Sequence, residues 1–287
     1  MYVGRFAPSP TGALHLGSLV AALGSFLEAR RHGGHWLVRM EDLDPARTVP
    51  GSAEGILRSL EACGLEWDGA VEFQSRRTAH YAQALESLRR LGLTFECSCS
   101  RRQLAAADTG YPGTCRSGPQ SPGPTATRLR IEAGQTLVFE DRFQGRIETA
   151  MGELGDVIIR RRDGVYAYQL AVVVDDALQG ITDVVRGADL LESTGWQITL
   201  QRALGLPVPT HAHLPLLLER SGEKLAKSRR SLPLDPERAA AALLLALHLL
   251  GQSPPQALAG ATAREVLAWA QAHWRPAAFH GQRQRVI

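Results

Sequence analysis

Residues 2–18, which read YVGRFAPSPTGALHLGS, place an apolar segment, a proline- and glycine-rich loop and the start of a helical pattern in direct succession. We expect a strand at residues 2–6 and a helix at about residues 14–32. A second strand is expected at residues 35–40. A strand, a helix and a strand in this order predict a β-α-β unit, and such units build a parallel sheet covered by helices.

The rest of the chain continues this α/β pattern, with one exception. Residues 109–125 are rich in glycine, proline and serine and show no periodicity, which predicts an irregular insertion. Ser52 is expected to cap the helix that it begins. The remaining patterns predict helices at residues 52–63, 77–91, 188–204, 236–250 and 263–274, and strands at residues 127–131, 137–140, 156–160 and 165–174.

Composition narrows the class of protein without identifying a function. The chain has 287 residues, of which 44% are hydrophobic, and this is enough for one large core. A formal net charge of +3 predicts no partner by itself, so a nucleic acid would have to bind to a local basic surface. Since the sequence shows neither a long apolar run nor a signal segment, we expect a cytoplasmic protein that does not insert into membranes.

Two distant motifs carry groups that suit a nucleotide. His15, Gly17 and Ser18 fall in the first turn of the first expected helix, where free N–H groups and the helix dipole favour phosphate. Lys224 and Lys227 lie in the sequence EKLAKS and can neutralise charge on a transferring phosphoryl group. Each motif alone also fits a solvated surface segment, whereas both motifs on one α/β core predict an ATP site.

With these two motifs, the sequence resembles the class I aminoacyl-tRNA synthetases, whose signatures are written HIGH and KMSKS. It is similar above all to their glutamate-specific branch. Ser18 departs from the pattern, because it replaces the second histidine of the first signature. The segments that carry the narrower resemblance are residues 4–12, 39–44, 64–68, 172–176 and 185–191.

The resemblance implies a pocket for glutamate, whose two carboxylates require cations and whose ammonium requires an anion. Arg5 and Arg186 can each grip a carboxylate with two hydrogen bonds, and Glu41 suits the ammonium. Which arginine takes which carboxylate stays open, and a structural ion pair between Arg5 and Glu41 is the simpler alternative. The implied glutamate-binding residues are Arg5, Phe6, Ala7, Pro8, Ser9, Glu41, Tyr168 and Arg186; the implied ATP-binding residues are His15, Gly17, Ser18 and Lys227, with His15, Lys224 and Lys227 catalytic.

Three of the four cysteines are crowded into one short stretch. Cys97, Cys99 and Cys115 offer three thiolates, an incomplete tetrahedral set for zinc. Tyr111 stands at the position where truncated glutamate-specific relatives show a tyrosine, so the resemblance implies one structural Zn2+ held by these four residues. The alternative is a loop of reduced cysteines. Cys63, alone on an apolar helix face, is expected to fill the core.

The resemblance also implies the reaction. Only residues 229–287 follow the lysine motif, which matches the truncated glutamyl-Q tRNA(Asp) synthetases and leaves little room for an anticodon-binding domain. Members of that family activate L-glutamate with ATP and Mg2+ in the absence of tRNA. They then transfer it to queuosine at the wobble position of tRNA(Asp). We expect a monomer.

The fold class expected from all these features is α/β, a Rossmann-like parallel sheet with an inserted zinc-binding, acceptor-type subdomain and a short helical C-terminal region. The first and second halves of the catalytic domain are expected at residues 1–92 and 151–205. The insertion with the zinc site occupies residues 93–150, and the lysine-motif loop with the C-terminal helices occupies residues 206–287.

Three other functions fit part of the sequence. A short glutamyl-tRNA synthetase would charge the 3′ end of tRNA(Glu) and would need tRNA for activation. A small-molecule nucleotidyltransferase would share the first signature but would leave Arg5, Glu41 and Arg186 without a role. A non-catalytic tRNA-binding relative would be expected to have lost one signature. Both signatures keep their functional residues here, which argues against this alternative.

Overall fold

The β-α-β unit expected at the start of the chain is confirmed. The computed structural model describes residues 1–104, 110–218 and 234–286. Strand β1 (Val3–Phe6) is followed by helix α1 (Leu16–Arg31) and by strand β2 (His35–Met40). The two strands pair in parallel, with Val3 opposite His35.

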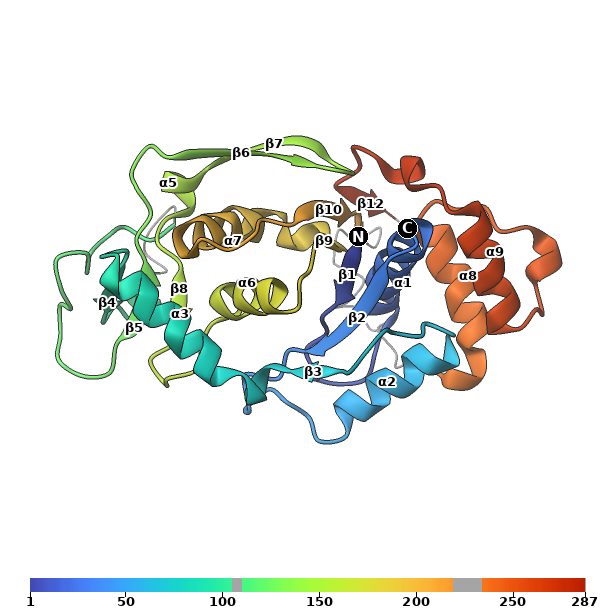
Figure 1. Ribbon diagram of the computed structural model, residues 1–287, viewed down its shortest axis with the longest axis horizontal. Coiled ribbons are helices and arrows are strands. Elements are labelled where there is room, and N and C mark those ends of the chain that lie inside the picture. Colours follow the sequence, from blue (N-terminus) through green and yellow to red (C-terminus); the bar gives the residue numbers. More distant parts are fainter. Residues whose placement is uncertain (105–109, 219–233, 287) are drawn as a thin grey trace.

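A twisted parallel sheet forms the centre of the molecule (Figure 1). Strand β3 (Glu72–Phe73) pairs in parallel with β2, and β10 (Thr210–Leu214) pairs in parallel with β9 (Asp183–Gly187). Strand β9 lies beside β1, where the Thr182 N–H donates to the Val3 carbonyl at 3.0 Å. The parallel strands therefore follow the order β3-β2-β1-β9-β10, as expected for a Rossmann-like fold.

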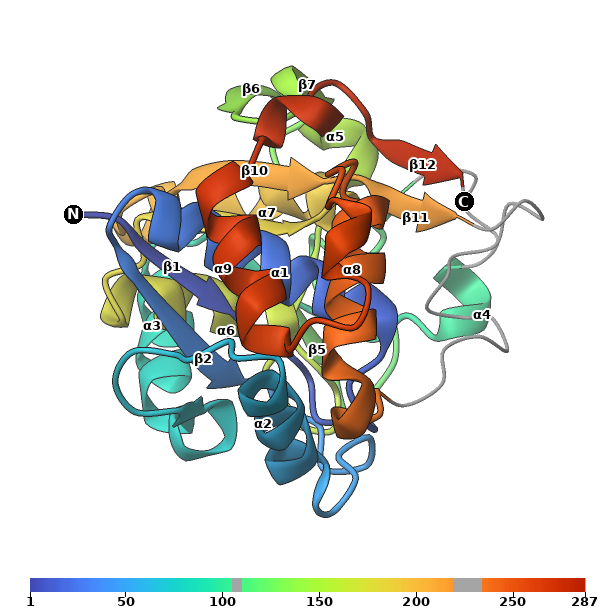
Figure 2. The same ribbon diagram turned by 90° about the vertical axis from the view of Figure 1, so that its right-hand side faces the viewer.

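Helices cover the sheet and bury two apolar clusters. Helix α1 packs against β1, β2 and β9, and helices α8 (Ala239–Leu249) and α9 (Ala263–His273) pack on its outer side (Figure 2). The second cluster lies among α3 (Thr78–Arg90), α6 (Tyr168–Leu178) and α7 (Leu191–Leu204). Helix α2 (Ser52–Ala62) belongs to the first cluster.

A small antiparallel sheet carries the cysteines. It consists of β4 (Thr94–Cys97), β5 (Ala126–Leu129) and β8 (Ile158–Arg160), and the described residues 110–125 between β4 and β5 are irregular, as predicted. The hairpin of β6 (Thr136–Asp141) and β7 (Gly145–Ala150) joins the main sheet through β10. Strand β8, in the predicted second half of the catalytic domain, pairs with β5 in the predicted insertion and so crosses the boundary at residue 150. The domain limits stay predictions.

Short elements complete the described chain. Strand β11 follows β10 and pairs in parallel with β12 near the C-terminus (Figure 2). No helix among the described residues is long and apolar enough to cross a membrane. The short elements are α4 (Arg101–Leu104), α5 (Met151–Leu154), β11 (Leu216–Leu218), β12 (Gln284–Val286) and the 3-10 turns Gln74–Arg76, Ala188–Leu190, Pro236–Arg238, Gln256–Leu258 and Pro276–Phe279.

The strand predicted at residues 165–174 is wrong, because Tyr168–Leu178 forms helix α6. All residues from Leu170 to Asp176 are buried, so this helix is covered on every side over two turns. A helix buried all round has no polar face and shows no helical period in its sequence. The run of three valines then favoured a strand, which a buried helix segment can imitate.

The cap predicted at Ser52 is also wrong. Gly51 is the N-cap residue of α2, in the left-handed conformation with φ of 75°, and it makes no side-chain cap. The Ser52 hydroxyl instead donates to the Gly12 carbonyl at 2.5 Å and accepts the Gly12 N–H at 3.1 Å. The side chain therefore ties α2 to the loop that precedes α1.

Candidate functional site

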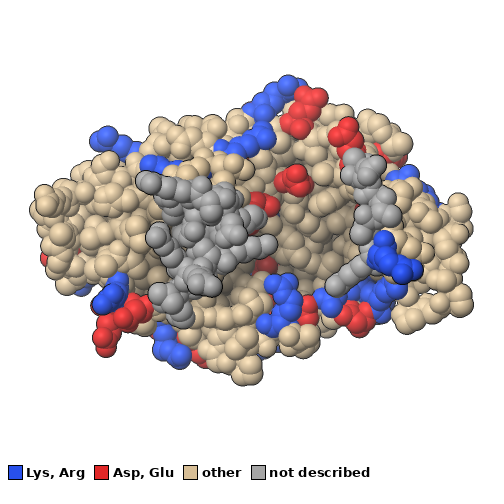
Figure 3. All heavy atoms as spheres, turned by 180° about the vertical axis from the view of Figure 1, so that it is seen from behind, with Lys and Arg blue, Asp and Glu red and all other residues tan. Residues whose placement is uncertain are grey.

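A pocket of about 730 Å³ opens at the carboxyl ends of the parallel strands. Phe6, Glu41, Gly187 and Leu214 line it at the ends of β1, β2, β9 and β10, the edge at which open α/β sheets bind ligands. The opposite face to that of Figure 1 is hollowed near its centre, with acidic side chains inside the hollow and basic ones around it (Figure 3). The pocket residues that sequence analysis proposed for glutamate and ATP are Arg5, Phe6, Ala7, Pro8, Ser9, His15, Gly17, Ser18, Glu41, Tyr168 and Arg186.

The first motif forms the N-terminus of α1. His15 is the N-cap residue, and its Nδ1 accepts the Ser18 N–H at 3.2 Å. Its proton must then sit on Nε2, which lies 3.0 Å from the Ser18 hydroxyl. Burial lowers the pKa of His15, so the ring is neutral at pH 7. The serine that replaces the second histidine thus accepts the Nε2–H of the first, which leaves the hydroxyl hydrogen of Ser18 as a donor for a phosphate in the pocket that both residues line.

Arg5 is held by a buried carboxylate that sequence analysis did not assign to the site. Its Nε and Nη2 donate to Asp176 at 3.3 and 3.2 Å, and Arg39 contacts the same carboxylate at 2.8 Å. Although burial opposes ionisation, the two guanidinium groups hold the pKa of Asp176 at about 2. The pairing leaves the Nη1 group of Arg5 without a partner among the described residues, on a side chain that lines the pocket.

Arg186 uses most of its donors inside the protein. Its Nε donates to His213 at 3.1 Å, its Nη1 to the Tyr168 hydroxyl at 3.3 Å, and its Nη2 to Thr194 at 2.8 Å and to the Leu190 carbonyl at 3.3 Å. A guanidinium has five N–H groups, so one on Nη1 is left over for a ligand. The Tyr168 hydroxyl, which also lines the pocket, stands beside it.

Glu41 does not pair with Arg5, contrary to the simpler alternative. Among the described residues its ion pair is with Arg39, at 3.5 Å, and the Glu41 side chain is 9% exposed. Burial raises the pKa of Glu41 to about 7, against the charges of Arg39 and Arg5 and with some help from Asp176. A buried carboxylate with one long ion pair is a suitable partner for an ammonium group that enters the pocket.

The second motif cannot be placed, because Lys224 and Lys227 lie outside the described residues. Strand β11 ends at Leu218, and Leu216 and Leu217 line the pocket. Leu217, the last described residue before this motif that lines the pocket, precedes Lys224 by seven residues in the sequence.

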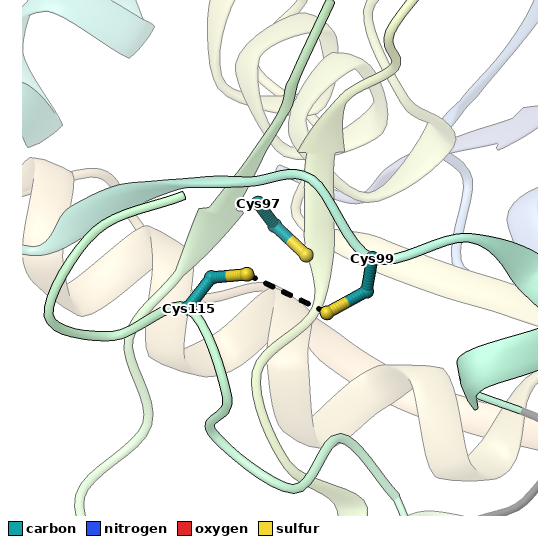
Figure 4. A group of neighbouring side chains, drawn as sticks. All are labelled: Cys97, Cys99 and Cys115. Atoms are coloured by element: carbon teal, nitrogen blue, oxygen red, sulfur yellow. Dashed lines mark hydrogen bonds between the residues drawn. The ribbon is translucent and has the colours of Figure 1, made fainter. Parts of the chain in front are cut away.

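The predicted metal ligands come together at the tip of the small sheet. The three cysteine sulfurs lie within 4.8 Å of one another and point to a common centre (Figure 4). The Tyr111 hydroxyl oxygen lies 3.5 Å from the sulfur of Cys97 and 3.8 Å from that of Cys99, and it accepts the Cys115 N–H at 2.8 Å. Burial raises the pKa of the Cys115 thiol, but hydrogen bonds from Tyr111 and the Ser98 backbone outweigh it and bring the pKa to about 6. Cys63 is buried in the main core, as predicted.

Several buried residues around the pocket were missed by sequence analysis. Arg39 and Asp176 fall inside segments that carried the family resemblance, so a signal for them existed. His213, Asp141 and Thr194 had no such signal, since three separate elements bring them to Arg186.

Comparison with known proteins agrees with this geometry. The family described as tRNA synthetases class I (E and Q), catalytic domain, matches residues 2–258. A protein of Pseudomonas aeruginosa named glutamyl-Q tRNA(Asp) synthetase is 57% identical over 274 residues, covering 95% of this chain and 93% of that protein. A protein of the same name from Dechloromonas aromatica is 56% identical over 283 residues, covering 95% and 94%.

A solved structure supports the fold over the whole chain. The crystal structure of a glutamate tRNA ligase from Elizabethkingia meningosepticum, in complex with its amino acid, has a TM-score of 0.79 and 26% sequence identity. It covers 98% of this chain and 66% of that protein. The chain belongs to the class I tRNA synthetases (E and Q) and, among them, to the glutamyl-Q tRNA(Asp) synthetase family.

Proposed function

We propose that the protein activates L-glutamate with ATP in the absence of tRNA, and then transfers the glutamyl group to queuosine at the wobble position of tRNA(Asp). The observation that carries the first step is the pocket, which collects the described residues proposed for glutamate and for ATP in one cavity. The relatives that share more than half of its residues support the second step through their name.

The charges in the pocket suit glutamate. Arg5 offers its Nη1 group, which has no partner among the described residues, and Arg186 offers one N–H next to the Tyr168 hydroxyl. Both can therefore donate to carboxylate oxygens. Glu41 lies within the same cavity and can accept from the α-ammonium. Glutamine would leave a buried guanidinium without its anion, at a cost of about 3–5 kcal/mol.

Activation proceeds by an in-line displacement. An oxygen of the glutamate α-carboxylate bonds to the α-phosphorus of ATP, and the bond from this phosphorus to pyrophosphate breaks. The N-terminus of α1 and the hydrogen-bonded pair of His15 and Ser18 stabilise phosphate oxygens, while Lys224 and Lys227 neutralise the leaving pyrophosphate. Mg2+ bound with ATP would supply further positive charge to the phosphates. The products are glutamyl-adenylate and pyrophosphate.

Transfer uses the mixed anhydride just formed. A hydroxyl oxygen of the queuosine cyclopentene-diol attacks the glutamyl carbonyl, AMP leaves, and the hydroxyl proton goes to solvent or to the leaving phosphate. The result is an ester between glutamate and the modified base. Arginines around the hollow of Figure 3 are available for phosphate contacts with the anticodon arm.

The cysteine cluster fits a structural zinc ion. Three thiols within 4.8 Å of one another and the Tyr111 hydroxyl supply four donors, which is the number that closed zinc sites use. Such an ion would lock the irregular segment at residues 110–125 onto β4.

The test compares tRNA(Asp) that contains queuosine with the same tRNA lacking it, each incubated with the protein, ATP and labelled glutamate. We expect label only on the queuosine-containing tRNA, and equal labelling of both would refute the assignment. Glutamate-dependent pyrophosphate exchange without tRNA tests the first step separately. Exchange that requires tRNA(Glu) would favour a short glutamyl-tRNA synthetase, and adenylyl transfer without any amino acid would favour a nucleotidyltransferase.

A further inference from the structure

A buried chain of polar groups runs behind Arg186, on the side away from the pocket. His213 in β10 is 0% exposed, and its Nε2 lies 3.1 Å from the Nε of Arg186. Its Nδ1 lies 2.5 Å from the Oδ2 atom of Asp141 in β6. Asp141, 2% exposed, also accepts the N–H groups of Phe143, Gln144 and His213 at 2.9 to 3.1 Å. His213 lies outside the residues that line the pocket.

The partners of His213 fix the position of its proton. The Nε of an arginine carries a hydrogen at any ordinary pH, so the Nε2 of His213 must be the acceptor. The proton of the neutral ring then sits on Nδ1 and is donated to Asp141. Burial and the charge of Arg186 lower the pKa of His213 to about 4 against the opposing effect of Asp141, which agrees with a neutral ring.

Thr194 completes the arrangement. Its hydroxyl accepts from the Nη2 of Arg186 at 2.8 Å and lies 3.2 Å from both the Leu190 carbonyl and the Nε2 of His213. Because Arg186 already occupies the lone pair of Nε2, the threonine proton goes to Leu190. Two acceptors thus hold one edge of the guanidinium plane and leave Nη1 toward Tyr168 and the pocket.

We propose that His213, oriented by Asp141, is a positioning residue for glutamate recognition, because it accepts from Arg186 and fixes the plane in which this arginine meets the substrate carboxylate. The inference rests on the proposed function, since it takes glutamate as the ligand of Arg186. If Nε2 of His213 carried a proton, that hydrogen would face the hydrogen on Nε of Arg186. The repulsion between them would turn Arg186 out of this plane.

His211 is a natural comparison. It lies two residues earlier on the same strand, is 3% exposed, and stacks on His213 with 6.2 Å between ring centroids. Among the described side chains, His211 makes its ring contacts to His213 and Phe139 and has no hydrogen bond to Arg186. Both histidines are therefore buried on the same strand, but of the two only His213 has a described hydrogen bond to Arg186.

Two amide substitutions at His213 test its contact to Arg186 and its contact to Asp141 separately. His213→Gln can place an amide oxygen where Nε2 stands and keep the acceptor for Arg186, whereas His213→Asn reaches only the position of Nδ1 and keeps the contact to Asp141. We expect His213→Asn to weaken glutamate binding by about 10- to 100-fold, the effect of one buried hydrogen bond to a charged group. His213→Gln and the control His211→Gln should stay within about threefold of wild type.

Titration calorimetry with glutamate and, separately, with ATP measures this without tRNA. The ATP affinity and the melting temperature of all three variants should stay close to wild type. Equal losses in both His213 variants, or no loss in either, would overturn the proposal. A wild-type protein that fails to bind glutamate would overturn the proposed function as well, so the two failures are distinguishable.

A measurement on the unchanged protein covers the case in which His213→Asn does not fold. Long-range 1H–15N spectra at pH 7, assigned by the signal that vanishes in His213→Gln, report which ring nitrogen carries the proton. We expect a neutral ring protonated on Nδ1. A proton on Nε2, in either the neutral or the charged ring, contradicts the proposal.

Discussion

At the scale of single residues, the pocket is organised by buried charge pairs. Asp176 lies between Arg5 and Arg39, and Arg186 is held by His213 and Thr194, so the ligand-facing groups have little freedom to move. A preorganised cation loses less conformational entropy on binding than a mobile one. The pocket thus meets the ligand with its charges already in place.

The raised pKa of Glu41 predicts a pH dependence of glutamate binding. Because the pKa of Glu41 is about 7, its carboxyl group is mostly protonated in the free protein below pH 7. A neutral carboxyl group cannot form an ion pair with the α-ammonium of glutamate, so binding requires Glu41 to ionise. We expect affinity to be about tenfold weaker at pH 6 than at pH 8 and to level off above pH 8. Calorimetry across this range measures it, with Glu41→Gln as the control in which the pH dependence disappears. A constant wild-type affinity from pH 6 to pH 8 would contradict the assignment.

The cysteine cluster predicts loss of metal in one variant and not in another. Cys97→Ser combined with Cys99→Ser removes two of the three sulfurs that lie within 4.8 Å of one another, so we expect zinc to fall from about one ion per chain to a trace. Cys63→Ser is the matched control, because Cys63 is buried in the main core away from the cluster. Plasma emission analysis of the purified proteins gives the metal content. A full zinc content in the double variant would show that Cys97 and Cys99 are not zinc ligands.

At the scale of secondary-structure elements, Ser52 and Ser59 make a matched pair on α2. Ser52 holds Gly12 through two hydrogen bonds, whereas Ser59 donates to the Gly55 carbonyl of its own helix at 2.9 Å. We expect Ser52→Ala to lower the free energy of unfolding by about 1–2 kcal/mol and to raise the KM for ATP, because the loop before α1 loses its tether. Ser59→Ala should change neither. Urea unfolding and pyrophosphate exchange measure these effects, and equal behaviour of the two variants would count against the tether.

Helix α6 shows how an element can serve the site from within the core. Its first residue, Tyr168, reaches the pocket, and Asp175 and Asp176 near its other end anchor arginines of neighbouring elements. Buried carboxylates are stable only when they are paired. The helix is therefore held in one rotation about its axis, which keeps the Tyr168 hydroxyl next to Arg186.

At the scale of the whole molecule, the distribution of lysine gives a direct test of the ATP site. The sequence has two lysines, Lys224 and Lys227, both in the second motif. If they contact the phosphates, ATP at ten times its Kd should slow their acetylation about tenfold by mass action. The amino group of Met1, a residue that is 92% exposed, is the internal control and should react at the same rate with and without ATP. Peptide mass spectrometry reads both, and unprotected lysines would place the motif outside the ATP site.

The sequence by itself determined the central fold, because the proline- and glycine-rich loop before α1 and the two glycines after it are local signals that bound a long helix. It also predicted residues that the fold brings together: those proposed for glutamate line one pocket with His15, Gly17 and Ser18 of the first motif. It could not determine α6, because a run of three valines inside a short buried helix of 11 residues imitates a strand.

Only the tertiary structure decided how the charges are distributed. Arg5 and Asp176 are 171 residues apart, and Asp141 and His213 are 72 apart, yet each pair shares a hydrogen bond. No local pattern encodes such pairs, since they depend on how the sheet orders its strands. The sequence therefore named the groups that we propose as ligand contacts, while the fold chose the partners that hold those groups in place.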